Sequence, residues 1–319
     1  MVRSHTVTAW IILVALGLLA PPGGQTQTAG PLDPAVLEPL LRGAATTAPG
    51  TYVVTAGSLA PAADAIPLLV QADAHRDAGQ TIRVTVALGG EVSRGTAVRL
   101  RILSPDGTAA RPPRVVADAT AFPPEGRMRL VREFTLAAGE YDLQAAVGHR
   151  RAEGGAIAAL AKVRLTVPDV WRGPLAVTPI VLGETVSAAP PAQTGAFIFG
   201  PTALIPATSN GFAQGGELHV AFRVFNWKAE PGKKPDLTAE YTFYQQTEKR
   251  LAFFNKMKPQ RLDAGTLGEA FDPAAGVVTA GMTVPLQAFP FGEFQLKVRV
   301  TDNAGGQSAE QQVRFVVSP

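Results

Sequence analysis

Apolar residues alternate with polar ones along much of the chain, most regularly near its C-terminal end. The alternate apolar positions there are Phe294, Leu296, Val298, Val300, Val313, Phe315 and Val317. In an extended chain, alternate side chains share one face. Residues 302–306, Asp-Asn-Ala-Gly-Gly, separate the two groups and supply turn chemistry. Residues 291–317 are therefore predicted to form a hairpin with one buried and one solvated face.

An earlier part of the chain repeats this pattern. Residues 139–143, Gly-Glu-Tyr-Asp-Leu, match residues 292–296, Gly-Glu-Phe-Gln-Leu. Residues 79–86 resemble residues 215–222 in the same way. We interpret the chain as two diverged copies of one β domain.

Short alternating runs separated by Gly and Pro predict the other strands. They lie at 66–70, 81–88, 97–103, 128–136, 140–147 and 162–167 in the first copy, and at 196–199, 203–205, 217–225, 237–245 and 277–284 in the second. The predicted fold is all-β: two tandem immunoglobulin-like antiparallel β-sandwich domains after a signal peptide and a Pro/Ala-rich segment. The side chains of Phe222, Phe294, Leu296 and Phe315 should be almost fully buried.

The predicted organisation has five parts. They are a signal peptide and cleavage region at 1–29, a Pro/Ala-rich tether at 30–65, sandwiches at 66–168 and 196–319, and a linker at 169–195. In the tether, Asp33 could cap a helix that starts at Pro34, but Pro39 would keep that helix short. The proline pairs at 112–113 and 123–124 exclude a helix or a central strand between them.

The N-terminus is typical of a secretory signal. Arg3 and His5 precede an apolar run at 9–20, followed by small polar residues. The run is shorter than the roughly 20 apolar residues that span a bilayer, although an uncleaved N-terminal anchor is the alternative. We expect an exported protein, periplasmic or extracellular, with no integral membrane span once the signal is removed.

Composition narrows the function classes. The net charge of +3 and the pI near 9.3 are mildly basic, far from the profile of a nucleic-acid-binding protein. The chain has no cysteine, which excludes disulfides, a thiol nucleophile and a thiolate zinc site.

No motif of a known reaction is present. The chain lacks Gly-x-Ser-x-Gly, a phosphate-binding Gly-x-x-x-x-Gly-Lys loop and His-Glu-x-x-His. His75 is expected in a loop, His149 in a hairpin turn and His219 on the polar face of a strand. Asp302 and Asn303 could bind calcium, but turn residues are the preferred interpretation. We expect no enzyme activity, no catalytic or metal-ligating residue and no cofactor.

One segment, residues 226–261, concentrates lysines with aromatic residues between them. Its candidate binding residues are Trp227, Lys228, Lys233, Lys234, Lys256 and Lys258, with Tyr244, Phe253 and Phe254 nearby. One interpretation is a hairpin whose lysines solubilise an edge strand. The other is a surface that binds an anionic polymer, with Trp227 either stacking on a sugar ring or packing beneath the loop.

The second copy resembles a known type of module. Residues 225–227, 234–236, 239–241 and 290–302 are similar to the C-terminal β domain of exported bacterial GWxTD-domain proteins. The first copy, with residues 139–143 and 163–168, resembles tail modules of von Willebrand factor A-related bacterial proteins. The Gly-Trp-x-Thr-Asp and Asp-x-Ser-x-Ser motifs of the head domains are absent. The resemblance implies a role in the cell envelope and no chemistry.

These observations leave three functions open. The leading hypothesis is a non-enzymatic exported β-sandwich protein that binds or organises a cell-envelope partner, either a protein or an anionic polysaccharide. The alternative is a periplasmic chaperone or assembly factor that acts by β-strand addition. A hydrolase with scattered catalytic residues ranks last.

The signal pattern generates the first testable prediction. Protein recovered from the periplasm or the medium should lack roughly its first 20–30 residues. N-terminal sequencing measures this directly, and an intact Met1 on membrane-bound protein would contradict it.

Overall fold

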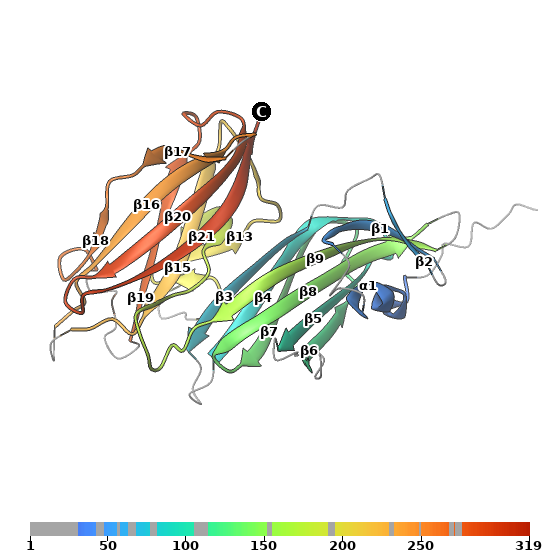
Figure 1. Cartoon of the computed structure of the whole chain (residues 1–319), viewed down its shortest axis with the longest axis horizontal. Helices are drawn as coiled ribbons and strands as arrows, with labels where there is room; N and C mark the ends of the chain where they lie inside the picture. The colour runs from blue at the N-terminus through green and yellow to red at the C-terminus, as the bar shows by residue number, and fades with distance from the viewer. Residues whose placement is uncertain are drawn as a thin grey trace, which may run out of the picture. The chain divides into compact units, whose positions relative to one another are not determined.

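The chain is all-β, as predicted (Figure 1). A computed structural model describes residues 31–42, 48–55, 58–62, 68–76, 82–104, 114–151, 155–190, 195–229, 233–248, 250–267, 271 and 276–319. The predicted signal peptide at 1–29 lies outside them. The described strands form four sheets, which we name A to D in chain order.

Sheets A and B are built from the first half of the chain. Sheet A has the order β2-β1-β9-β8-β5-β6, and sheet B has the order β3-β4-β7. The bounds are β1 Gly50–Thr55, β2 Ser58–Pro61, β3 Leu69–Arg76, β4 Ile82–Val92, β5 Ala97–Ser104, β6 Arg114–Ala121, β7 Gly126–Leu136, β8 Gly139–Arg150 and β9 Ala156–Val167. The segment between the two proline pairs, where no strand was predicted, forms the edge strand β6.

Sheets C and D follow. Sheet C has the order β10-β15-β11-β13-β12 with β19 on the other side of β15, and sheet D has the order β14-β21-β20-β16-β17 with β18 also beside β16. The bounds are β10 Ala176–Val177, β11 Val181–Ala188, β12 Ile198–Phe199, β13 Thr202–Pro206, β14 Gly211–Ala213, β15 Glu217–Phe225, β16 Leu237–Gln246, β17 Leu251–Lys256, β18 Gln260–Leu262, β19 Val277–Pro285, β20 Gly292–Asp302 and β21 Gln307–Ser318.

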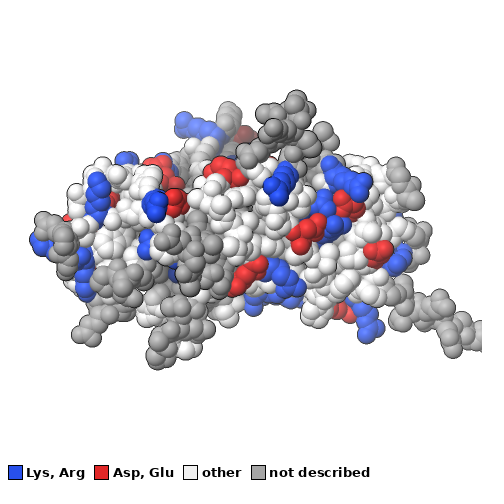
Figure 2. All heavy atoms as spheres, turned by 90° about the horizontal axis from the view of Figure 1, so that it is seen from below, with Lys and Arg blue, Asp and Glu red and all other residues white. Residues whose placement is uncertain are grey.

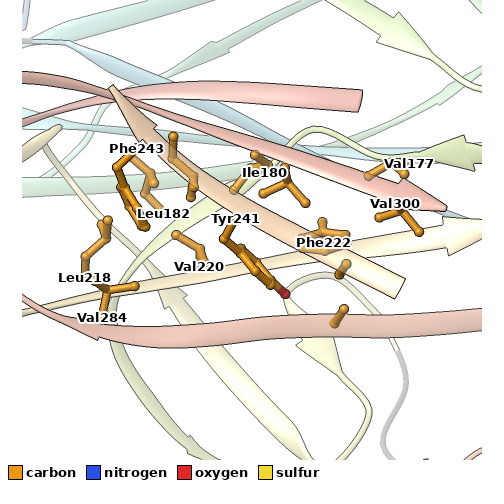
Figure 3. Packing of buried hydrophobic residues seen from close by; sticks show 14 of the residues in the cluster. Val177, Ile180, Leu182, Leu218, Val220, Phe222, Tyr241, Phe243, Val284 and Val300 are labelled. Atoms are coloured by element: carbon orange, nitrogen blue, oxygen red, sulfur yellow. The ribbon is translucent and has the colours of Figure 1, made fainter. Parts of the chain in front are cut away.

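Sheets C and D enclose the largest apolar core. The predicted hairpin is β20 and β21, and its alternating apolar residues point inward. Phe222, Phe294, Leu296 and Phe315 are all at most 1 % exposed, which confirms their predicted burial. Figure 3 shows Phe222 of β15 and Tyr241 of β16 meeting in this core, with their ring centroids 6.2 Å apart.

Sheets A and B enclose a second core, which an N-terminal helical segment extends. The segment comprises the 3₁₀-helix η1, Pro34–Leu37, and the helix α1, Glu38–Arg42. Asp33 caps it as predicted, because its Oδ1 accepts from the N–H of Ala35 at 2.9 Å.

Two predicted connections are corrected by the structure. The described part of residues 30–65 is packed and is not a loose tether: Leu32, Leu37 and Leu40 are buried against sheet A, and β1 pairs with β9. The expected linker at 169–195 contains two strands of sheet C, β10 and β11. The side chains of Val181 and Leu182 in β11 are fully buried. Both regions are rich in proline and alanine, which obscures the apolar pattern of their helices and strands in the sequence. Residues Pro31–Pro319 form one compact unit, and the predicted domain boundaries stay predictions.

A buried ion pair connects sheets B and C. Asp73 of β3 accepts from Nε and Nη2 of Arg223 of β15, at 2.9 Å each. The side chains are 0 % and 7 % exposed. Asp73 also accepts from the N–H of Phe197, and the guanidinium of Arg223 lies over the ring of Phe199. Every charge-bearing atom of the carboxylate therefore has a partner, as a buried charge requires.

Further contacts extend this interface along β3 and β7. Gln71 accepts from the N–H of Leu182 at 2.6 Å and donates to the carbonyl oxygens of Leu182 and Ala207. Arg129 pairs with Glu184 at 2.6 Å. Sheet B is consequently covered on one face by sheet A and, along β3, on the other by sheet C, whereas the outward side chains of β7 stay exposed.

His219 lies on the predicted polar face of a strand, β15, but that face is covered. Its side chain is therefore only 8 % exposed, with Nδ1 2.9 Å from Oγ1 of Thr283. The predictions for the other two histidines are wrong. His75 lies within β3 and His149 near the end of β8, not in loops. Burial lowers the pKa of His149.

The helical segment is held to sheet A by a charge cluster. Glu38 of α1 pairs with Arg99 and Arg101 of β5, at 2.6 and 2.8 Å, and Asp118 of β6 pairs with the same two arginines. Burial alone would raise the pKa of Glu38, but hydrogen bonds from Arg101 and Arg42 outweigh it and hold the pKa below 4.5. Burial would also raise the pKa of Asp118, but hydrogen bonds from Arg99 and Arg101 outweigh it and hold the pKa below 3.8.

The buried pair gives a prediction about stability. Arg223→Met should lower the free energy of unfolding by about 3–5 kcal/mol, because it leaves the Asp73 carboxylate buried and unpaired. The double variant Asp73→Leu/Arg223→Met should lose less than the single variant, since no charge remains buried. Urea titrations measure both.

Lys297→Met is the matched control, because Lys297 pairs with Glu310 at 2.7 Å where the side chains are 36 % and 42 % exposed. It should cost under about 1 kcal/mol. Equal losses for Arg223→Met and Lys297→Met would contradict the importance of the buried pair.

The charge cluster predicts an acid-dependent loss of stability. Both carboxyl pKa values are lowered on folding, so their contribution is present above about pH 4.5 and is lost as the pH falls through the lowered values. Glu38→Gln/Asp118→Asn should therefore show a shallower fall in unfolding free energy below about pH 4.5 than the parent. Urea titrations from neutral pH downward compare them. His149 titrates at higher pH and is present in both proteins, so it does not affect the difference between them. If unfolding free energy falls equally with pH in both proteins, Glu38 and Asp118 are not the source of the acid-dependent loss.

Candidate functional site

The predicted basic and aromatic residues lie along one edge of sheet D and in the connection that enters it from β15. Their segment runs from the end of β15 through β16, β17 and β18 (Figure 1). β17 is an edge strand that bears Lys256, as the solubilising interpretation requires.

Trp227 packs inward and does not stand free. Its ring lies against the C/D core, with its centroid 5.7 Å from that of Phe271. The preceding Asn226 has a φ of 60°, the left-handed conformation that Asn tolerates. Its Nδ2 faces the carbonyl oxygens of Asp169, Arg172 and Pro174, at 2.6, 3.2 and 3.1 Å. Trp227 thus packs beneath the loop, and Asn226 holds residues 169–174 beside it.

Lys228 lies beside a buried carboxylate. Asp302, 1 % exposed, accepts from the backbone N–H of Lys228 at 2.8 Å and from those of Ala304 and Gly305. These three N–H groups fill the acceptor positions of Asp302, which supports its interpretation as a turn residue. Lys233 and Lys234 precede β16 at the same end of sheet D.

Lys256 and Lys258 lie elsewhere along the edge. Lys256 is paired with Thr242 in the register, five residues along β16 from its start at Leu237, which corresponds to about 17 Å. Its Nζ is 2.6 Å from Oε1 of Glu240, and this hydrogen bond is the largest cause that lowers the pKa of Glu240. The six candidates therefore fall into two groups, residues 227–234 at one end of sheet D and Lys256 with Lys258 farther along its edge. In the second group, Glu240 neutralises the charge of Lys256.

An exposed aromatic pair lies next to the second group. Phe253 of β17 is 65 % exposed and meets Tyr244 of β16 edge to face, with 6.3 Å between the ring centroids. Strand alternation turns the next residue, Phe254, inward against Phe289 and Phe294. The exposed ring of Phe253 and the half-buried ring of Tyr244 therefore form an apolar surface of two nearly perpendicular rings on the solvated face of sheet D, beside Lys256.

The rest of that face is polar and internally bonded. Gln295 donates to Gln312 at 3.0 Å, and Lys297 pairs with Glu310. On the face of the molecule drawn in Figure 2, basic and acidic side chains are interspersed and do not gather into one basic area. Any ligand on sheet D would meet amides, hydroxyls and paired charges around the aromatic surface.

Within the described residues there is no group of three or more acidic or histidine side chains that could hold a metal ion. No helix in that part of the chain is long and apolar enough to cross a membrane.

Comparison with known proteins identified no matching family model and no similar curated protein. The resemblance to GWxTD-domain and von Willebrand factor A-related modules therefore stays a prediction. Sequence reasoning named Tyr244 and Phe253 only as neighbours of the lysines. The signal that distinguishes Phe253 from Phe254 is the alternation along β17, which directs adjacent side chains to opposite faces.

Proposed function

We propose that the protein is a non-enzymatic, exported protein that binds an anionic polysaccharide of the cell envelope on the surface formed by β16 and β17. The observation that carries this proposal is the exposed aromatic pair of Phe253 and Tyr244 beside Lys256. An aromatic ring offers a sugar an apolar surface, and the ammonium group offers a carboxylate or sulfate on the polymer a counter-charge.

The polar surroundings support the same ligand class. A polysaccharide presents hydroxyl groups along its length, which can exchange hydrogen bonds with Gln295, Gln312 and Thr242. Exposed charges contribute little individually and are screened by salt, so the aromatic surface should supply much of the affinity. Lys258, exposed in the connection after β17, adds a second positive charge at the same edge of sheet D.

The test measures binding of a soluble polyuronic acid by isothermal titration calorimetry at low and physiological salt. Phe253→Ser should weaken binding by roughly three- to tenfold, the loss of an aromatic contact. Lys258→Gln should weaken it mainly at low salt. Glu240→Gln should strengthen it, because the Lys256 ammonium then has no protein carboxylate competing for it.

Phe122→Ser is the matched control, because Phe122 is 56 % exposed but follows β6 in sheet A. It should leave binding unchanged. Equal weakening by Phe253→Ser and Phe122→Ser, or weakening by Glu240→Gln, would contradict the proposed surface.

A further inference from the structure

An open strand edge at β19 differs from the other long edges of the described sheets. β19 pairs with β15 on one side, and no other described strand pairs with it. Its nine residues, Val-Val-Thr-Ala-Gly-Met-Thr-Val-Pro, include no charged residue. The other long edges carry charges or irregularities: β7 has Arg127, Arg129, Arg132 and Glu133, and β17 has Lys256 and a register shift. Edge strands without such protection are templates for pairing with another chain.

The backbone groups on the open side can be identified. The N–H of Leu286 donates to the carbonyl oxygen of Gly216 at 3.0 Å, so Glu217 and Pro285 between them are a non-hydrogen-bonded pair. By alternation, Thr279, Gly281 and Thr283 direct their N–H and C=O groups away from β15. Among the described residues, no backbone hydrogen bond outside the strand pairing ends on them. Thr283 is exposed, and Thr279 and Gly281 are half-buried.

There is room beside this edge. A pocket of about 320 Å³ is lined by Thr279–Thr283 of β19, by Val220 and Ala221 of β15, by Gln260 of β18, and by residues of β11, β12 and β13. Gly281 lies at the middle of β19, where a Cβ would meet the carbonyl oxygen of Val220 at 2.3 Å. Only glycine fits there, because a Cβ would run into the backbone of β15.

The sequence of β19 is nearly palindromic about Gly281. It reads Val278, Thr279, Ala280, Gly281, Met282, Thr283, Val284. If two copies of β19 pair antiparallel with Gly281 opposite Gly281, each Thr279 faces Thr283, each Val278 faces Val284 and each Ala280 faces Met282. Thr–Thr and apolar cross-strand pairs are favourable, and no like charges are opposed. Pro285, which has no N–H to donate, falls at the end of the paired segment.

We infer that β19 is a self-association surface, which joins two copies of this chain through a two-fold antiparallel strand pair centred on Gly281. The interface is isologous, so it closes at the dimer and does not propagate. The outward N–H and C=O groups of Gly281, Thr279 and Thr283 bond reciprocally between the copies. A pair of nine-residue strands is small beside the roughly 1,600 Å² of a stable interface, so the dimer should dissociate in about the micromolar range.

The first test is sedimentation velocity of the purified chain over a concentration series. The parent should change from monomer to dimer as its concentration rises through about the micromolar range. Thr283→Lys should abolish the dimer, because it places a solvated charge on the edge. The control is Ser187→Lys, an exposed position on β11, where the strand edge at that point is already paired with β13. It should leave the dimer intact.

The second test is of register and uses the absence of native cysteine. Thr279→Cys and Thr283→Cys chains are oxidised separately and as a mixture. In the inferred register, residues 279 and 283 of the two copies have Cα atoms about 5.5 Å apart, within disulfide range. Residues 283 and 283 are about 13 Å apart along the strands, beyond that range.

Covalent dimer should therefore form in the mixture and not in either single-variant sample. A parent that stays monomeric, a dimer that survives Thr283→Lys, or equal cross-linking in single-variant samples would overturn the inference. If the parent protein stays monomeric and instead binds an extended peptide along β19, the inference is also wrong, and β19 pairs with a strand of another protein. Far-ultraviolet circular dichroism of each variant verifies that it folds.

Discussion

The arrangement of the described sheets depends on one buried ion pair, Asp73 with Arg223. Neither charge is tolerable in an apolar interior unless the other is present with its hydrogen bonds complete. The carboxylate receives the fork of the guanidinium and the N–H of Phe197, and the guanidinium also bonds the carbonyl oxygen of Gly195. A small displacement of sheet C against sheet B would break these bonds without exposing either group to water. The pair therefore selects one register between the sheets more than it adds to their attraction.

This constraint explains which parts of the fold could be predicted. The hairpin of β20 and β21 has one apolar and one polar face, and simple alternation identifies both. β15 also alternates, but its polar face is covered, with Arg223 bonded to Asp73 of sheet B. His219 and Arg223 are therefore buried although their chemistry predicts exposure. The burial of Leu37 and Leu40 is concealed in a similar way, because neighbouring prolines are more typical of a tether. Local pattern specifies a strand, whereas its coverage depends on residues more than 100 positions away.

The charge of the lysine-rich segment also could not be predicted from local sequence alone. Sequence clusters positive residues, yet Glu240 lies beside Lys256, and Asp236 and Asp263 lie beside Arg261. Cross-strand carboxylates thus convert an apparent basic area into a mixed one. What remains distinctive is the alternation along β17, which directs two adjacent phenylalanines to opposite faces: Phe253 points into solvent and Phe254 into the core.

The buried pair also affects the order in which the chain can fold. Asp73 and Arg223 are 150 residues apart, so their contact closes a long loop, and the entropy of that closure precedes any gain from the bond. During synthesis from the N-terminus, sheet B forms before β15 exists, and the Asp73 carboxylate stays hydrated on its outer face until β15 arrives. Completion of the interior is therefore a late event, and the outer face of sheet B is the surface that a nascent chain exposes longest to unproductive contacts.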